Sequence, residues 1–312
     1  MTAFAFVFPG QGSQAVGMLD AWGDHPAVAA TLKEASAALG EDIGRLIHEG
    51  PKEQLDLTTN TQPVMLTAGI AAWRAWQAEG GAVPVAVAGH SLGEYTALVA
   101  AGVLSLADAL PLVRLRATAM QEAVPVGVGA MAAILGLDAQ AVRDGCKAAA
   151  EASGEVVEAV NFNDPKQTVI AGSKAGVDKA CELLKAAGAK RALLLPVSAP
   201  FHSSLMKPAA LRLQAALEKL TLSAPAFPVV NNIDVATPTD AAAIRDALVR
   251  QAAGPVRWVE VVQALRARGV THVVECGPGK VLAGMARRID GELVTGSIFD
   301  PATLAETKGI LQ

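Results

Sequence analysis

The sequence predicts an α/β protein whose parallel sheet is covered by helices on both faces. Short continuous apolar runs alternate along the chain with longer helical patterns, as in buried parallel strands joined by helices. Hydrophobic residues make up 52% of the 312 residues but aromatic residues only 4%, so the core must consist mainly of Ala, Val and Leu. The many alanines favour helix. A chain of this length can bury a large core and has room for about two domains.

The first part of the chain predicts the beginning of this core. Strands are expected at 4–8 and 85–88, and helices at 27–39 and 62–78. The apolar start has no basic segment and does not match a signal peptide, so we expect the first strand there. The apolar region 83–113 could span a bilayer by length, but a buried strand, turn and helix explain it better. Polar residues interrupt it at His90, Ser91, Glu94 and Asp108.

From about residue 125 the order of the expected elements changes to strand, helix, strand, strand, helix, strand. This order is typical of a ferredoxin-like fold. The elements are expected at 130–135, 139–152, 156–161, 168–171, 174–187 and 192–197. A hairpin turn is expected at 163–166, whose Asn, Asp and Pro residues favour turns. The sequence therefore predicts a small domain at 125–198, inserted into a core domain formed by 1–124 and 199–312.

The last part of the chain predicts a return to the α/β core. Helices are expected at 204–220, 241–252 and 258–268, and strands at 229–231 and 272–275. The last strand runs into Gly277-Pro278-Gly279, followed by a helix from Lys280. We interpret the glycines there as a strand-to-helix turn and not as a ligand site.

Charge and cysteine content exclude some functions. The formal net charge of −4 provides no general attraction to nucleic acid or to an anionic membrane. Three widely spaced cysteines do not form the disulfide framework of a secreted domain, so reduced thiols and a cytoplasmic location are expected.

The stretch Gly89-His90-Ser91-Leu92-Gly93 follows a predicted strand and precedes a predicted helix. In this context G-x-S-x-G indicates a nucleophile elbow, with Ser91 exposed at the start of the helix and the N–H of Leu92 directed at a developing oxyanion. The alternative is a plain turn. His90 is expected to support the turn by packing or hydrogen bonding, because a neighbour in a tight turn points away from the serine hydroxyl.

A serine nucleophile needs a base within hydrogen-bond reach. Among the five histidines, His25, His48 and His272 are expected to be surface or structural residues. His202 follows a predicted strand and precedes a helix, in the type of loop where α/β proteins place catalytic groups. We therefore predict His202 as the base.

The glycine-rich segment 10–14 could be interpreted as a phosphate loop. It lacks G-K-[ST] and the complete dinucleotide pattern. We expect a tight turn that brings backbone amides to the elbow.

Five motifs in order resemble the malonyl-CoA:acyl carrier protein transacylase family of type II fatty acid synthesis over nearly the whole chain. They are the blocks 8–14, 89–95, Arg116, 200–203 and 275–280. The resemblance implies an α/β-hydrolase-like core with an inserted ferredoxin-like domain. It implies that Ser91 is the nucleophile and His202 the base, and that the carbonyl of Gln251 orients His202. It also implies that Arg116 binds the malonyl carboxylate. The backbone amides of Gln11 and Leu92 would form the oxyanion hole.

The resemblance also implies the reaction. Malonyl would pass from malonyl-CoA to Ser91 and then to the phosphopantetheine thiol of holo acyl carrier protein, without a metal or a permanently bound cofactor. In polyketide synthase relatives, Phe at the position of Phe201 with an aliphatic residue at Leu92 accompanies malonyl in preference to methylmalonyl. From the residues alone, Arg116 would be interpreted as a helix-surface arginine like Arg114.

Other functions remain open on the sequence. A serine esterase or thioesterase would use the same elbow, but no acid between Ser91 and His202 has a suitable context, and Asp164 in a hairpin turn is a poor candidate. A trans-acting polyketide acyltransferase and a non-catalytic docking subunit are further alternatives. Six basic residues against two acidic ones at 166–191 indicate either a solvated helix face or a docking surface for an acidic carrier protein, at Lys190 and Arg191. A monomer is expected.

Overall fold

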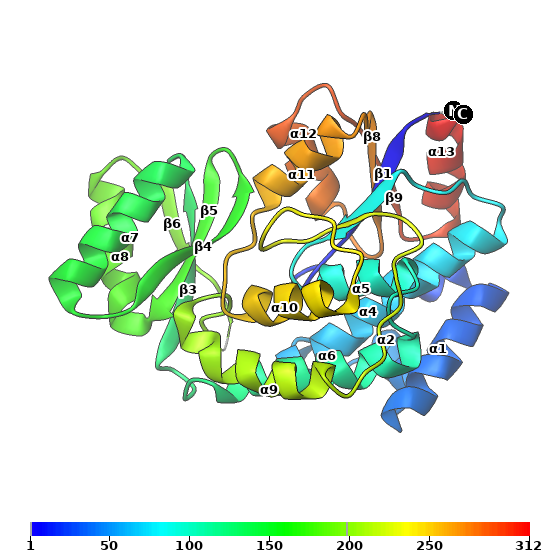
Figure 1. Cartoon of the computed structure of the whole chain (residues 1–312), viewed down its shortest axis with the longest axis horizontal. Helices are drawn as coiled ribbons and strands as arrows, with labels where there is room; N and C mark the ends of the chain where they lie inside the picture. The colour runs from blue at the N-terminus through cyan, green and yellow to red at the C-terminus, as the bar shows by residue number, and fades with distance from the viewer. Residues whose placement is uncertain (1, 198) are drawn as a thin grey trace.

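The computed structural model describes residues 2–197 and 199–312 and contains two separate sheets (Figure 1). The first has five strands in the order β7-β2-β1-β8-β9, and all neighbouring strands are parallel. Their bounds are β1 Phe4–Phe8, β2 Ala86–Gly89, β7 Val229–Val230, β8 His272–Cys276 and β9 Val294–Ile298. The predicted α/β core with a parallel sheet is thus confirmed.

Side chains alternate along β1 between two hydrophobic clusters, one on each face of this sheet. Phe4, Phe6 and Phe8 belong to the larger cluster, which includes residues of α4, α5 and α6. Ala5 and Val7 belong to the other cluster, which includes residues of α11 and α12. Successive residues of a strand point to opposite faces, so both faces of the sheet are buried under helices.

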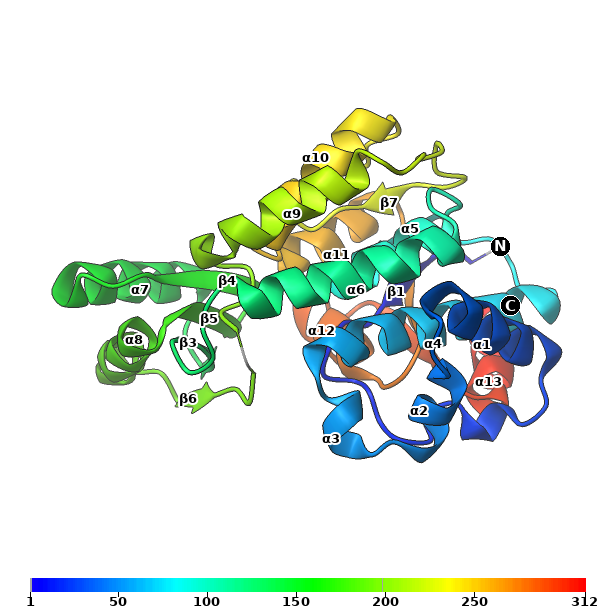
Figure 2. The same cartoon turned by 90° about the horizontal axis from the view of Figure 1, so that it is seen from below.

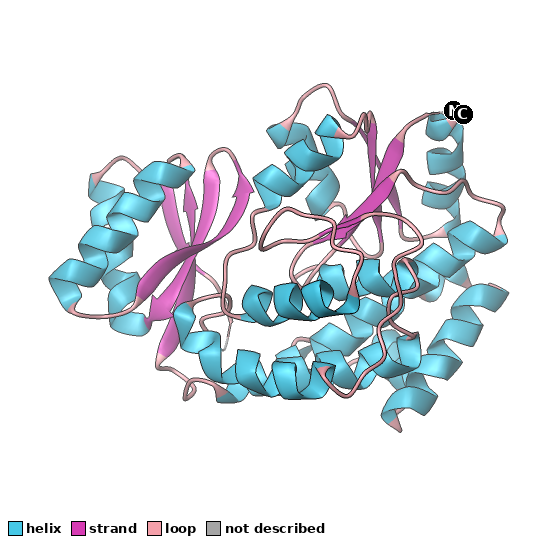
Figure 3. Ribbon diagram, in the orientation of Figure 1, coloured by secondary structure: helices cyan, strands magenta, loops and turns pink. Residues whose placement is uncertain are grey.

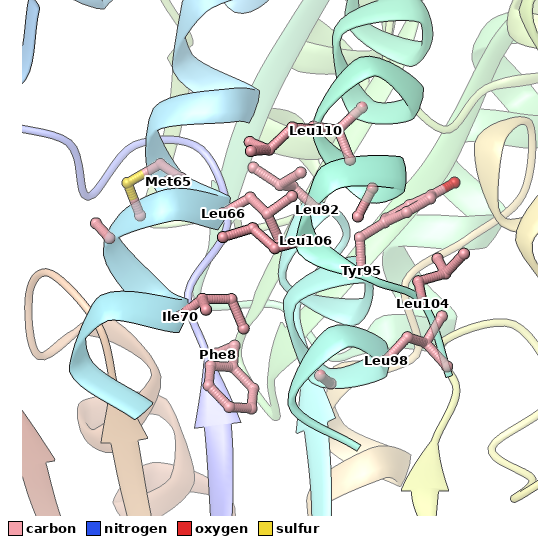
Figure 4. Packing of buried hydrophobic residues seen from close by; sticks show 14 of the residues in the cluster. Phe8, Met65, Leu66, Ile70, Leu92, Tyr95, Leu98, Leu104, Leu106 and Leu110 are labelled. Atoms are coloured by element: carbon pink, nitrogen blue, oxygen red, sulfur yellow. The ribbon is translucent and has the colours of Figure 1, made fainter. Parts of the chain in front are cut away.

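The helices of this part surround the sheet (Figure 3). They are α1 Pro26–Leu39, α2 Ile43–Glu49, α3 Lys52–Leu55, α4 Thr58–Ala78, α5 Leu92–Ala100, α6 Leu106–Glu122, α9 Lys207–Leu217, α10 Ala241–Ala252, α11 Trp258–Ala267, α12 Val281–Ile289 and α13 Pro301–Leu311, with short 3₁₀ turns at Asp20–Trp22 and Ser204–Met206. Aliphatic side chains of α4, α5 and α6 pack against one another next to the end of β1 (Figure 4). This packing fixes the helix that follows the predicted elbow.

The second sheet is antiparallel, with strand order β4-β5-β3-β6. It comprises β3 Gly129–Leu135, β4 Val157–Asp164, β5 Gln167–Ser173 and β6 Arg191–Leu194, with α7 Ala139–Ser153 and α8 Lys174–Ala186. The two helices share one hydrophobic cluster with the sheet. The strand order along the chain and across the sheet is the ferredoxin-like one. Ser198, the last residue of the predicted small domain, lies outside the described residues.

Local sequence explains where many helices begin. In five helices, the side chain of the residue before the first turn accepts a hydrogen bond from a backbone N–H of that turn. These residues are Asp42 before α2, Ser105 before α6, Asp138 before α7, Ser173 before α8 and Asp240 before α10. Such caps satisfy amides that have no partner within the helix.

Several elements differ from the sequence prediction. The helices α2, α3 and α13 and the edge strand β9 were not predicted, no range was predicted for α6 although Arg114 and Arg116 were expected on a helix, and β6 ends at Leu194 instead of continuing to residue 197. The β9 segment contains Gly296 and Ser297 and is buried only at its end, so it lacks the continuous apolar run of a central strand. Figure 2 shows α6 running from the parallel sheet towards the second sheet. None of the described helices is long and apolar enough to cross a membrane.

Candidate active site

The predicted nucleophile Ser91 lies in the sharp turn between β2 and α5. Its φ of 52° is in the left-handed region that residues other than glycine rarely adopt. A Cβ at Gly93 would lie 2.0 Å from the carbonyl oxygen of Phe8, and a Cβ at Gly89 would lie 1.9 Å from the backbone of Gly93. The close approach of β1, β2 and α5 therefore requires both glycines, and it holds Ser91 at the carboxyl end of the sheet.

Asn232 fixes both sides of this turn, although its sequence context had not marked it as a site residue. Its Oδ1 accepts the backbone N–H of Ser91 at 2.7 Å, and its Nδ2 donates to the carbonyl of Gly89 at 2.7 Å. It is fully buried and follows β7, the strand next to β2. A signal was present in the polar pair Asn231 and Asn232 directly after a short apolar strand, because carboxyl ends of parallel strands meet at one edge.

The structure brings His202 to the nucleophile. His202 Nε2 lies 2.7 Å from Ser91 Oγ, and His202 Nδ1 lies 2.9 Å from the carbonyl oxygen of Gln251. Because a carbonyl only accepts, Nδ1 carries the proton and Nε2 is left to accept the serine proton. Asp164 lies elsewhere and pairs with Arg288 at 2.7 Å. The histidine is thus oriented by a carbonyl and not by a carboxylate.

Arg116, on α6, is only 2% exposed and points at the same serine. Its Nη2 donates to Ser91 Oγ at 3.1 Å and to Gln251 Oε1 at 3.0 Å, and its Nη1 donates to Gln62 Oε1 at 2.9 Å. These acceptors are all neutral, and no carboxylate among residues 2–197 and 199–312 forms a salt bridge with Arg116. The guanidinium is buried without a counter-ion in direct contact, whereas Arg114 pairs with Glu41 at 2.8 Å.

Two further buried side chains complete the network around Gln251, on α10. Gln62 on α4 binds Arg116, as described above, and Glu94 on α5 accepts the side-chain N–H of Gln251 at 3.0 Å. Gln251 Nε2 also donates to the carbonyl of Ser91 at 3.0 Å. Neither Gln62 nor Glu94 was predicted as a site residue. Glu94 stands in the elbow motif itself, and Gln62 is a polar residue in a helix that is otherwise largely apolar.

The buried position controls the protonation of the base. Burial and, to a smaller extent, the positive charge of Arg116 lower the pKa of His202 to about 3, against the hydrogen bond to Gln251. His202 is therefore neutral at neutral pH, with Nε2 ready to accept a proton. Its basicity depends on the charge beside it.

The two predicted oxyanion donors lie on either side of the elbow. Leu92 is the first residue of α5, where backbone N–H groups have no partner within the helix. Gln11 follows β1, and a Cβ at the preceding Gly10 would lie 2.6 Å from the carbonyl oxygen of His90, so this turn presses against the elbow. Within the described part of the chain, neither amide has a hydrogen-bond partner. The Gln11 side chain donates to Thr58 Oγ1 at 3.2 Å.

A cavity of about 460 Å³ opens beside Gln11. It is bounded by segments from around both sheets: the start of α4, the end of α6 and the segment after β6. Its lining residues are Gln11, Asp56, Leu57, Thr58, Thr59, Gln121, Val126, Pro196 and Val197. A substrate arm could reach the elbow from this side.

The other predicted residues have clear places. Phe201, next to His202, is half-buried and packs against clusters of both sheets. His90 Nε2 lies 2.8 Å from Asn163 Oδ1 at the end of β4, so it ties the elbow to the second sheet. The remaining histidines are outside the site: His25 caps α1, His48 bonds to Asp20 and His272 bonds to Thr271.

A basic pocket of about 550 Å³ lies where β4 ends, one residue beyond Asn163. We define it by its lining residues Leu135, Gly136, Asp164, Lys166, Gln167, Lys190 and Arg288. Arg288 pairs with Asp164, but Lys166 and Lys190 have no salt bridge within the described residues. Of the two predicted docking residues, Lys190 lines this pocket and Arg191 is the exposed first residue of β6.

A half-buried serine whose hydroxyl lies 2.7 Å from a histidine nitrogen, on a parallel sheet joined to a ferredoxin-like sheet, fits an enzyme of the acyltransferase class. The model of the acyl transferase domain family matches residues 5–289. The malonyl CoA-acyl carrier protein transacylase of Salmonella typhimurium is 56% identical over 306 residues, covering 98% of both chains. The transacylase of the same name from Bacillus subtilis is 46% identical and covers 97% of this chain and 96% of its own.

Solved structures agree with these relatives. The acyl-carrier-protein S-malonyltransferase of Burkholderia pseudomallei has a TM-score of 0.97 and 67% identity, covering 99% of this chain and 100% of that one. A malonyl-transacylase in complex with its type II PKS acyl-carrier protein has a TM-score of 0.97 and 50% identity, with the same coverage. The chain belongs to the family of malonyl CoA-acyl carrier protein transacylases.

Proposed function

We propose that the chain transfers the malonyl group from malonyl-CoA to the phosphopantetheine thiol of acyl carrier protein, through a malonyl ester of Ser91. The observation that carries this proposal is Arg116: a buried guanidinium aimed at the nucleophile with only neutral partners. A malonyl carboxylate would supply the missing counter-ion through two parallel hydrogen bonds. An acetyl group would leave the charge unpaired.

In the first half-reaction the Ser91 hydroxyl attacks the thioester carbonyl while its proton passes to His202 Nε2, 2.7 Å away. Negative charge develops on the carbonyl oxygen, and the free amides of Gln11 and Leu92 would stabilise it. The carbon–sulfur bond breaks, and the coenzyme A sulfur takes the proton from His202. The products are malonyl-Ser91 and free coenzyme A.

In the second half-reaction the carrier thiol replaces coenzyme A. It gives its proton to His202 and attacks the ester, and Ser91 leaves with that proton. The Gln251 carbonyl keeps Nδ1 protonated throughout, so the same nitrogen serves both halves. The bound malonyl carboxylate also offsets the charge of Arg116, which raises the basicity of His202 when substrate is present.

Acyl-chain selectivity involves the residues next to the reacting groups. We propose that Phe201, together with Leu92, limits branching at the malonyl carbon. The support is its position beside the base, half-buried between the clusters of the two sheets. The cavity beside Gln11 is the proposed route for the long arm of the thioester.

The basic pocket is the proposed docking surface for the acidic carrier protein. Lys166 and Lys190 line it without a salt bridge in the described structure, and Arg191 adjoins Lys190. Asn163 connects this region to His90, beside the nucleophile. Complementary charge mainly accelerates encounter, which suits a partner that must leave after each transfer.

We further propose two domains, 1–124 with 199–312 and 125–198, acting as a monomer in the cytoplasm. Each domain is supported by a sheet with its own hydrophobic cluster. A monomer suffices because one chain supplies every site residue. The three cysteines are free thiols, in agreement with a reducing compartment.

The test is to treat the protein with malonyl-CoA, to digest it, and to measure the mass of the Ser91 peptide. We expect a malonyl adduct that disappears when holo carrier protein is added, with malonyl recovered on the carrier. Ser91→Ala should form no adduct. Rapid hydrolysis of malonyl-CoA without transfer would instead establish a thioesterase.

A further inference from the structure

Glu94 connects the segments that hold the nucleophile and the base. Its Oε2 accepts the backbone N–H of Asn232 at 2.8 Å and the side-chain N–H of Gln251 at 3.0 Å. Asn232 in turn holds the backbone of Ser91, and the carbonyl of Gln251 holds His202. One buried carboxylate oxygen on α5 therefore joins the loop after β7 to the carboxyl end of α10.

The side-chain amide of Gln251 lies between two charged groups. Its Oε1 accepts from Arg116 at 3.0 Å, and its Nε2 donates to Glu94 at 3.0 Å. The amide dipole thus points its oxygen at the cation and its N–H at the anion. A flipped amide would place like-signed ends against both charges. Glu94 is 2% exposed, so water cannot take over its hydrogen bonds to Asn232 and Gln251.

We infer that Glu94 is a positioning residue for acyl transfer, which acts through Gln251 and Asn232. In a Ser-His-Asp triad the acid bonds the histidine directly, whereas here Gln251 lies between the carboxylate and His202. The inference rests on the proposed roles of Ser91 and His202. Ionised Glu94 makes charge-assisted hydrogen bonds, about twice as strong as neutral ones. These bonds hold Gln251, which supports His202, and the turn around Ser91 in one geometry. The negative charge of Glu94 also partly offsets the positive charge of Arg116 without direct contact, so the position proposed for the substrate carboxylate stays free.

The protonation of Glu94 provides a readout. Burial raises the pKa of Glu94 to about 7, against its hydrogen bonds to Asn232 and Gln251 and the charge of Arg116. The charged and titratable groups that face it are Arg116 from α6, Tyr95 from its own helix and Asp234 from the loop before α10; Asp234 is paired with Arg250. His202, with a pKa of about 3, does not titrate near neutral pH. Protonation of Glu94 therefore predicts a loss of rate on acidification through neutral pH, and the comparison of Glu94→Gln with Glu275→Gln assigns that loss to one of the two buried carboxyl groups.

The experiment is single-turnover acylation of Ser91 by saturating malonyl-CoA as a function of pH. The wild type should lose rate as the pH falls through about 7. Glu94→Gln keeps the shape of the side chain but resembles the protonated state. It should remain at the low rate at every pH, about tenfold below wild type at about pH 8. Its malonyl-to-acetyl preference should not change, because Arg116 keeps its own contacts.

Glu275→Gln is the matched control. Glu275 is also fully buried, accepts a backbone N–H from Ala283 at 2.9 Å, and has a pKa that burial raises to about 7, but among the described residues it has no hydrogen bond to Asn232 or Gln251, the two partners of Glu94. The control should keep both the wild-type rate and the pH dependence. If it lost both as Glu94→Gln does, the effect would be a general one of removing a buried charge and the inference would fail.

The outcomes separate cleanly. A folded Glu94→Gln protein with the wild-type rate, or with an unchanged loss of rate on acidification, overturns the inference. Should this variant not fold, Glu94→Asp decides: the midpoint of the pH dependence must move, and an unmoved midpoint overturns the inference. Acylation that survives in Ser91→Ala would refute the proposed function instead, independently of Glu94.

Discussion

Arg116 donates a hydrogen bond to the nucleophile itself, with Nη2 3.1 Å from Ser91 Oγ. The arginine therefore donates to the hydroxyl that is proposed to react, and its charge lowers the pKa of the neighbouring His202. A substrate carboxylate would draw the guanidinium into an ion pair and relieve both effects. In the proposed mechanism, substrate selection and nucleophile activation thus both depend on the side chain of Arg116.

Replacement of Arg116 by alanine should reduce kcat/KM for malonyl-CoA by roughly 10- to 150-fold, because a charged hydrogen bond contributes about 1.5–3 kcal/mol. Relative activity with acetyl-CoA should rise. Initial rates with both thioesters provide the measurement, and Arg114→Ala, which removes a surface pair with Glu41, serves as the control. An unchanged malonyl preference would contradict the assigned role of Arg116.

The lowered pKa of His202 predicts that the free energy of unfolding falls at acidic pH. The native histidine stays neutral down to about pH 3, whereas the unfolded one takes up a proton below its ordinary pKa of 6.5. Stability is therefore lost as the pH falls from 6.5 towards 3. Between about pH 7 and about pH 5 the wild type should lose about 2 kcal/mol more unfolding free energy than His202→Gln, measured by urea titration.

His48 provides a control of opposite sign for that comparison. Its hydrogen bond to Asp20 raises its pKa, so its contribution is present at low pH and is lost as the pH rises. Relative to His48→Gln, the wild type should gain a little stability on acidification. A His202→Gln protein whose pH dependence matches that of the wild type would show that His202 titrates normally in the fold.

The elbow predicts a sharp steric limit at Gly93. An alanine Cβ would lie 2.0 Å from the carbonyl oxygen of Phe8, and backbone must move to accommodate it. Gly93→Ala should lower the unfolding free energy by about 3 kcal/mol. Gly284→Ala, within α12 and 3.4 Å from the flexible end of Arg288, should instead add up to about 1 kcal/mol. Equal effects in denaturant titrations would refute the packing described for the elbow.

Charge reversal at the proposed docking surface should separate the two half-reactions. Lys190→Glu is expected to lower kcat/KM for the carrier protein about tenfold at low salt, since it repels an acidic partner. Loading of Ser91 from malonyl-CoA should not change. Lys33→Glu, on α1 and away from the basic pocket, is the matched control. If Lys190→Glu slowed neither step, the carrier must dock elsewhere.

Phe201 should govern tolerance of a branched acyl group. Phe201→Ala removes bulk beside His202 and is expected to raise the rate with methylmalonyl-CoA relative to malonyl-CoA by roughly tenfold, the usual value of a small hydrophobic contact. Competition between the two thioesters for Ser91, followed by mass spectrometry, measures the ratio. A ratio equal to that of the wild type would remove Phe201 from the selectivity determinants.

The sequence predicted those elements whose signal is local. Continuous apolar runs marked β1, β2 and β8, and the strand–turn–helix context identified the turn around Ser91. The missed strand β9 carries no such run, because it lies at the edge of its sheet and is partly exposed. Helices α2 and α3 are too short to display several turns of a helical repeat.

The sequence by itself determined the family and the candidate reacting groups: a serine between glycines, a histidine in a loop before a helix, and five motifs that together point to one family. The tertiary structure alone decided how they meet. Gln251 lies 160 residues from Ser91 and Asn232 lies 141 residues from it, yet both hold its backbone. No local pattern encodes which atoms meet, because these contacts arise only where a helix end and the end of a parallel strand are brought to the same turn and buried polar groups must find partners. For the same reason Arg116 resembles a surface residue on its helix and becomes a buried cation only when α4, α5 and α10 close around it.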